Sequence, residues 1–124
     1  AQNDQELQRA IHAISSAPNV YVLGMRSSFS VAHYMASRLS EIRENIHLIQ
    51  SVGMLYPEEI VSAKEGDIIL PCAISSLSYK NSYAAPLSLS NYLIAAIAQE
   101  NYEESQKVLE KTESILNQGF YLGL

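Results

Sequence analysis

Short apolar runs alternate with stretches of helical spacing along the chain, and this alternation limits the possible folds more than any other feature. The runs fall within residues 19–24, 45–51 and 67–70. The first run is apolar on both faces, which is typical of a strand buried in a parallel sheet. Because helical segments separate the runs, we predict an α/β fold, a three-layer sandwich whose parallel sheet is flanked by helices.

The helical segments also indicate how the chain is organised. Helices are expected at residues 4–17, 30–42, 57–64 and 84–99, and a last one opens at 101. We interpret residues 1–18 as a connector helix that enters the domain, and residues 19–124 as one domain. The helix at 84–99 is apolar nearly all round and is expected to be buried in the core or at an interface. The last helix is expected to face inward through Val108, Leu109, Ile115 and Leu116.

The composition narrows the class of protein. The chain has 13 acidic against 8 basic residues, a formal net charge of −5, which disfavours a nucleic-acid groove on this domain. Its one cysteine, Cys72, cannot form an internal disulfide, so a reducing compartment is expected. Its apolar stretches are shorter than the ~20 residues that span a bilayer, and no signal peptide is visible. We therefore expect a small, soluble, cytoplasmic domain.

The loop after the first strand is the best candidate for a binding site. Residues 24–30, Gly-Met-Arg-Ser-Ser-Phe-Ser, combine a glycine at the strand exit with hydroxyls at a helix start. Free N–H groups at a helix N-terminus favour an anion such as phosphate, and Arg26 adds charge-assisted hydrogen bonds. The alternative is that the serines only cap the helix and that Arg26 is solvated.

Two segments resemble a known family. Residues 21–34, YVLGMRSSFSVAHY, resemble the opening of the sugar isomerase (SIS) domain of RpiR-type bacterial transcription regulators, one subgroup of which has a G-[LM]-R-S-S loop here. Residues 82–97, SYAAPLSLSNYLIAAI, are similar to the C-terminal helix of that domain. The resemblance implies a flavodoxin- or Rossmann-type topology and a bound phosphosugar. It also implies the contact residues: Ser27 and Ser28, the backbone of Gly24 and Met25, and Arg26 as part of the subgroup pattern.

The chain departs from that family in its middle. A SIS domain has about five strands and a second serine- or threonine-rich loop, whereas about three strands are recognisable here. We interpret this as the absence of a βαβ unit after residue 70, either through an internal deletion or because residues are missing from the sequence. We favour the second interpretation, because deletion of central strands would expose sheet edges. Ser76 and Ser78, with Ser75, are therefore either a second ligand loop or an ordinary polar loop.

No other residue pattern predicts catalysis or a metal centre. His12, His33 and His47 fall on three different expected elements, without the short spacings of a metal site. Cys72 has no basic neighbour that would lower its pKa, so a packing role is expected. No residue matches the base of a sugar isomerase by spacing. We therefore expect no cofactor and no enzymatic activity.

These points lead to one leading hypothesis about function. The resemblance implies the effector-binding domain of an RpiR-type regulator, in which a phosphorylated sugar changes the arrangement of attached DNA-binding heads. DNA would be bound only by an N-terminal helix-turn-helix domain that this sequence does not contain. SIS domains form homodimers or homotetramers through their outer helices, so the same is expected here, with no membrane partner. The alternatives are a SIS-type phosphosugar isomerase and a non-catalytic oligomerisation module.

Overall fold

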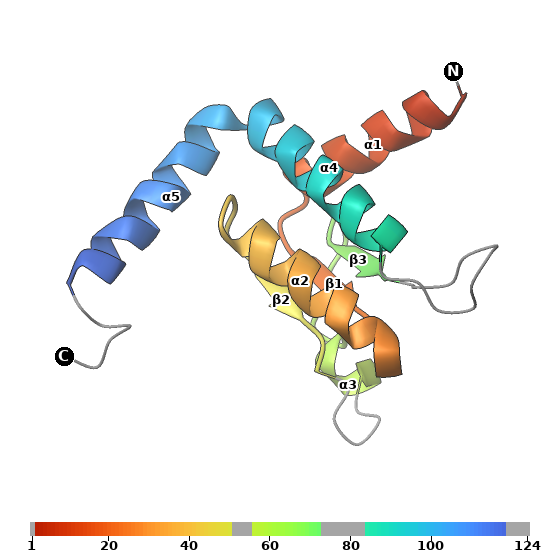
Figure 1. Cartoon of the computed structure of the whole chain (residues 1–124). Coiled ribbons are helices and arrows are strands. Elements are labelled where there is room, and N and C mark those ends of the chain that lie inside the picture. Colours follow the sequence, from red (N-terminus) through yellow and green to blue (C-terminus); the bar gives the residue numbers. More distant parts are fainter. Residues whose placement is uncertain (1, 51–55, 73–83, 119–124) are drawn as a thin grey trace.

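The chain folds into helices around a small parallel sheet. The computed structural model describes residues 2–50, 56–72 and 84–118. The elements are, in order, α1 (Gln2–Ser16), β1 (Val20–Leu23), the 3-10 turn η1 (Arg26–Ser28), α2 (Phe29–Ser40), β2 (Ile46–Leu48), α3 (Tyr56–Glu59), β3 (Ile68–Pro71), α4 (Ala84–Glu100) and α5 (Tyr102–Asn117). The predicted α/β class, with a parallel sheet flanked by helices, is confirmed (Figure 1).

The sheet has β1 at its centre. Its order is β2-β1-β3, and both pairings are parallel. Val20 is in register with Ile46 on one side and with Ile68 on the other. The three strands therefore end at the same edge of the sheet. β1 and β2 lie within the runs predicted as strands, and β3 extends one residue past its predicted run, to Pro71.

One face of the sheet carries the core. Val20 and Val22 alternate with Tyr21 and point to the face covered by helices, where both are fully buried. Figure 1 shows α2 and α4 in front of the sheet; α2 packs on β1 and β2, and α4 packs on α1 and α2. Side chains of α1, β1, α2 and α4 form one cluster, namely Ile11, Ile14, Ala17, Val20, Val22, Ala32, Met35, Ala36, Leu39, Ile42, Leu93, Ile94 and Ile97.

The opposite face of the sheet is more open. Tyr21, His47 and Ile69 are in register across the three strands. The ring of His47 stacks on Tyr21 with centroids 4.9 Å apart, and Ile69 is 44% exposed. Nε2 of His47 lies 2.9 Å from Oδ1 of Asn19, whose backbone and side-chain nitrogens both donate to Asp67 at 3.1 Å.

Arg43, in the connection between α2 and β2, holds the end of α1. Its guanidinium donates to the carbonyl oxygens of Ile14, Ala17 at 2.8 Å and Pro18 at 3.2 Å. These oxygens belong to the last turn of α1 and the connection to β1, where a helix leaves carbonyls without intrahelical partners. Partial burial lowers the pKa of Arg43. One side chain thus satisfies the helix end that would otherwise be desolvated without partners.

The expected inner face of the last helix is only partly correct. Val108 and Leu109 are half-buried, but Ile115 is 50% and Leu116 is 40% exposed. The chain turns at Asn101, and α5 then leads away from the body of the molecule (Figure 1). Its apolar stripe therefore passes beyond α4, so the inward packing predicted for Ile115 and Leu116 is wrong. On α4 itself Leu93, Ile94 and Ile97 are buried, whereas Leu89 and Tyr92 are about half exposed.

Candidate functional site

The loop that follows β1 lies where the three strands end. The carbonyl oxygen of Leu23 accepts a hydrogen bond of 2.7 Å from the backbone N–H of Cys72, just after β3. The carbonyl oxygen of Val22 accepts one of 2.9 Å from Ile49, just after β2. In open parallel sheets, ligands bind beyond this carboxyl edge. In Figure 1 it is the end of the sheet near α3 and the start of α2.

Gly24 makes the turn out of β1 possible. It is buried, and a Cβ placed on it would overlap the carbonyl oxygen of Ser28 and lie 2.8 Å from Cβ of Ala32. A larger residue would therefore push the first turn of α2 away from the sheet. The absence of a side chain brings the start of α2 directly against the end of β1, which is the arrangement the sequence predicted for an anion site.

Arg26 occupies an unusual backbone conformation at the head of this turn. Its φ is +56°, in the left-handed region that non-glycine residues rarely adopt. The side chain is exposed, and within the described ranges no hydrogen bond or ion pair engages its guanidinium. Such conformations cost on the order of 1 kcal/mol or more and cluster at ligand sites. The guanidinium is thus available to a ligand at the helix start.

Met25 and the two serines form the turn itself. The Met25 carbonyl accepts a 3.0 Å hydrogen bond from the N–H of Ser28, which closes η1. Ser28 stands at the N-cap position of α2, but its hydroxyl makes no capping hydrogen bond. The alternative that the serines only cap the helix is therefore not supported at Ser28. Ser27 is exposed and Ser28 half-buried.

Two side chains flank this edge that the sequence did not point to as site residues. The carboxylate of Glu59, in α3, accepts a 2.9 Å hydrogen bond from the N–H of Gln50, beyond the end of β2. Cys72 is half-buried, and desolvation raises the pKa of its thiol. No local signal in the sequence links Glu59 to the end of β2. Ser75, Ser76 and Ser78 lie outside the described residues.

The histidines are on separate elements. His33, on α2, has its ring centroid 6.3 Å from that of Phe29. Nδ1 of His12 is 3.6 Å from Oε1 of Glu100, while His47 contacts Asn19. In the part of the chain that the structure describes, no three His, Cys, Asp or Glu side chains are grouped so that they could hold a metal ion.

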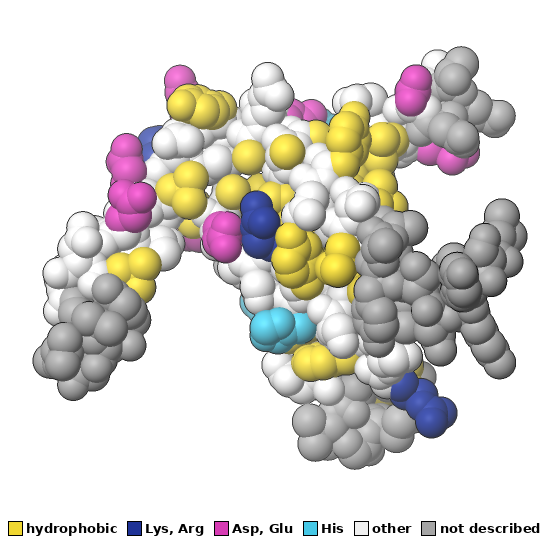
Figure 2. All heavy atoms as spheres, viewed as in Figure 1, with side chains coloured by type: hydrophobic (Ala, Val, Ile, Leu, Met, Phe, Trp, Pro, Cys, Tyr) yellow, Lys and Arg dark blue, Asp and Glu magenta, His cyan; other side chains and the backbone are white. Residues whose placement is uncertain are grey.

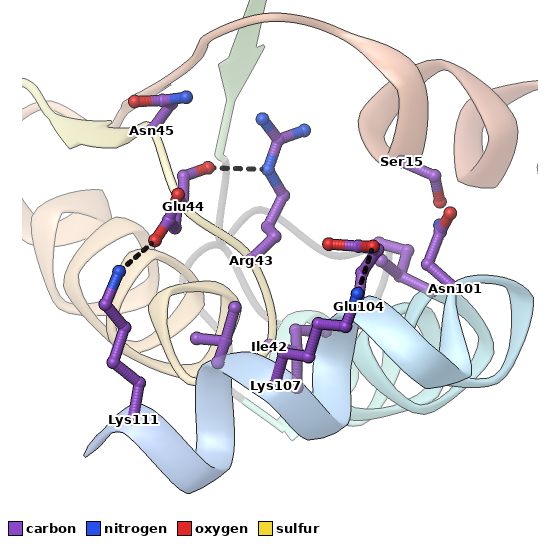
Figure 3. Close-up of a pocket in the computed structure, with 11 residues that line it drawn as sticks. Ser15, Ile42, Arg43, Glu44, Asn45, Asn101, Glu104, Lys107 and Lys111 are labelled. Carbon is purple, nitrogen blue, oxygen red and sulfur yellow. Dashed lines mark hydrogen bonds and ion pairs between the residues drawn. The ribbon is translucent and has the colours of Figure 1, made fainter. Parts of the chain in front are cut away.

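A hollow lies at the other end of α2 from this loop, between α5 and the α2–β2 connection. This groove of about 390 Å³ is lined by Ser15, Ile42, Arg43, Glu44, Asn45, Ile97, Asn101, Glu104, Lys107, Val108 and Lys111 (Figure 3). Nζ of Lys111 is 3.0 Å from Glu44, and Nζ of Lys107 is 3.4 Å from Glu104. The two lysines are thus paired with carboxylates, and the guanidinium of Arg43 is engaged by backbone carbonyl oxygens.

Comparison of the chain with models of known families, with curated proteins and with solved structures finds no match. No helix within residues 2–50, 56–72 and 84–118 is long and apolar enough to cross a membrane. We therefore infer a function from the loop at residues 24–28 and from the sequence resemblance that includes it.

Proposed function

We propose that this chain is a SIS-type effector-binding domain of an RpiR-type transcription regulator, and that residues 24–28 bind the phosphate of a phosphorylated sugar. The observation that supports the proposal is the turn at Gly24, after which Arg26, with an exposed side chain, and Ser28, whose hydroxyl makes no capping hydrogen bond, stand at the start of α2. The parallel sheet with β1 at its centre agrees with the flavodoxin-type topology that this proposal requires.

The chemistry of this turn suits a phosphate monoester. A planar guanidinium donates two parallel hydrogen bonds to phosphate oxygens, and hydroxyls donate to the remaining oxygen. The positive end of the α2 dipole adds attraction for a dianion. Each group interacts with the phosphate, so the sugar hydroxyls would be recognised by other parts of the carboxyl edge.

The proposal includes a mechanism of regulation. A ligand bound to one arrangement of two copies of the domain would shift the population toward that arrangement. In a cytoplasmic regulator, DNA-binding domains attached before α1 would then change their spacing. The attachment point is α1, whose end is held by Arg43.

Thermal unfolding with a panel of sugar phosphates tests the proposal. A ligand at one hundred times its dissociation constant stabilises the folded state by about 2.7 kcal/mol, so the unfolding temperature should rise. The rise should disappear in Arg26→Ala and in Ser28→Ala. It should persist in Arg9→Ala, which removes an exposed arginine from α1.

The matched ligands decide what is being recognised. Unphosphorylated sugars should give no shift, and inorganic phosphate a smaller one. If no sugar phosphate shifts the unfolding temperature, or if Arg26→Ala leaves the shift intact, the proposal is wrong. Exchange of the sugar α-proton in deuterated water would instead assign an isomerase.

A further inference from the structure

The groove between α5 and the α2–β2 connection has an aliphatic floor. Ile42 and Ile97, which are 7% and 2% exposed, line it from below, and the half-buried side chain of Val108 lines it from α5. We call these three side chains the floor. The groove has a volume of about 390 Å³, which lies within the usual range of small-molecule sites in proteins. It is therefore large enough for a small ligand with an apolar part.

One wall of the groove is held in place by Arg43. Its Nε donates to the carbonyl oxygen of Glu44 at 2.9 Å, and its two terminal nitrogens donate to carbonyl oxygens at the end of α1. Every nitrogen of this guanidinium is therefore engaged by the backbone. The cations that remain for a ligand are Lys107 and Lys111, one turn apart on α5.

Two exposed ion pairs give the groove charges of both signs. Nζ of Lys111 is 3.0 Å from Oε1 of Glu44 and joins α5 to the opposite wall, whereas Lys107 pairs at 3.4 Å with Glu104 of its own helix. In the view of Figure 3 the two pairs lie on either side of Ile42. A simple anion beside Lys111 would also meet the carboxylate of Glu44. The groove therefore complements a ligand that carries both charges.

An α-amino acid has the charge spacing that the pair of Lys111 and Glu44 calls for. Its ammonium and carboxylate groups are bonded to one carbon, so the two charges are about 3 Å apart. When the ligand lies antiparallel to the ion pair, its carboxylate contacts Nζ of Lys111 and its ammonium group contacts Glu44. Four charges then alternate in sign, and the side chain on the same carbon is free to cover the floor.

We propose that this groove binds an α-amino acid with an aliphatic side chain, whose two charges lie beside Lys111 and Glu44 and whose side chain packs on the floor. Burial of that side chain against aliphatic groups favours leucine, isoleucine or valine over a polar amino acid. The site lies at the other end of α2 from the loop at residues 24–28, and the proposal does not depend on that loop.

Equilibrium dialysis of the whole chain against labelled L-leucine tests this site. The parent chain should bind one leucine saturably. Leucinamide lacks the carboxylate, 4-methylpentanoate lacks the ammonium group and glycine lacks the side chain, so each should bind at least about tenfold more weakly. Equal affinity for leucine and leucinamide, or no saturable binding of leucine, isoleucine or valine, overturns the proposal.

Charge-neutral variants test the two partners of the ligand. Lys111→Gln and Glu44→Gln should each weaken leucine binding at least about tenfold, because each removes one charged contact. Both variants should remain folded, since an exposed ion pair contributes little to stability. Lys64→Gln and Glu65→Gln are the matched controls, because both side chains are exposed and neither lines the groove. Unchanged leucine affinity in the first two variants, or an equal loss in the controls, contradicts the assignment.

Amide hydrogen exchange gives a second measurement of the same contact. Lys111 and Glu44 belong to opposite walls, so a bound amino acid fastens α5 to the α2–β2 connection. Leucine should therefore slow the exchange of residues 110–117 in the parent chain and leave it unchanged in Glu44→Gln. Leucine that binds without slowing this exchange would show that the ligand does not join the two walls.

Discussion

The first and last helices have similar amphipathic sequences, but the apolar face is buried in the first and largely exposed in the last. α1 and α5 have 15 and 16 residues and are both amphipathic, with acidic side chains in the first turn. Ile11 and Ile14 of α1 are 2% and 3% exposed, whereas Ile115 of α5 is 50% exposed. The difference lies in what surrounds each helix: α1 packs on α4 and is held at its end by Arg43, while α5 turns away at Asn101. An amphipathic pattern thus predicts that the apolar face of a helix needs to be buried, but not which segment packs against it.

Matched leucine substitutions in the core and in the exposed part of α5 should give the largest contrast. Leu39 is fully buried at the centre of the core, so Leu39→Ala should lower the free energy of unfolding by about 2–5 kcal/mol. Leu116→Ala should change it by less than about 0.5 kcal/mol when the chain is monomeric. Urea denaturation of dilute protein measures both. Equal losses of unfolding free energy would show that α5 is packed against the rest of its own chain.

The turn at Gly24 should be the next most sensitive place. In Gly24→Ala the new methyl group overlaps the start of α2, and we expect a loss of about 1–3 kcal/mol, as for an overpacked core. Ser30→Ala, at an exposed position in the first turn of α2, is the control. Urea denaturation again gives the comparison. A neutral Gly24→Ala would mean that α2 does not pack tightly on β1.

Asp67 should make the stability of the body depend on pH. The backbone N–H of Lys64 donates to its carboxylate at 2.8 Å and, with the hydrogen bonds from Asn19, lowers the pKa of Asp67. A lowered carboxyl pKa adds stability above the usual value of about 3.9 and loses it as the pH falls through the folded-state value. Asp67→Asn should therefore be less stable than the parent chain at neutral pH, and the difference should shrink in acid. Denaturant titrations at several pH values would measure it, and a constant difference would contradict the assignment.

Breaking the ion pair between Glu44 and Lys111 should have the smallest effect on stability. Glu44→Gln removes the partner of Lys111, and we expect a change of less than about 0.5 kcal/mol in the free energy of unfolding. The amide protons of residues 110–117 should exchange faster in the variant than in the parent chain. Unchanged amide exchange in these residues would indicate that another contact holds α5 in place.

Local sequence rules predicted most of this fold. β-Branched runs located the three strands, and apolar spacing located α1, α2, α4 and α5, because each pattern reflects local geometry together with burial on one side. The helix predicted over 57–64 is wrong in extent, because α3 covers only Tyr56–Glu59. The rules failed at Ile115 and Leu116. These residues do lie on an apolar face of α5, but whether that face is buried depends on the direction the chain takes after Asn101.

The candidate site was predicted in part for the same reason. Gly24 and the serines could be located because a strand exit and a helix start are local signals. The left-handed conformation of Arg26 could not be anticipated, since nothing in its side chain favours it. The hydrogen bond from Gln50 to Glu59 joins the end of one strand to the next helix, and its geometry follows only from the assembled fold.

The hydrogen bond between Asn19 and His47 has a consequence for the chemistry of the sheet's open face. Because Nδ2 of Asn19 donates to Asp67, its Oδ1 can only accept, so Nε2 of His47 must carry a proton. The neutral ring is therefore held as the Nε2–H tautomer, in which Nδ1 keeps its lone pair and can accept a hydrogen bond.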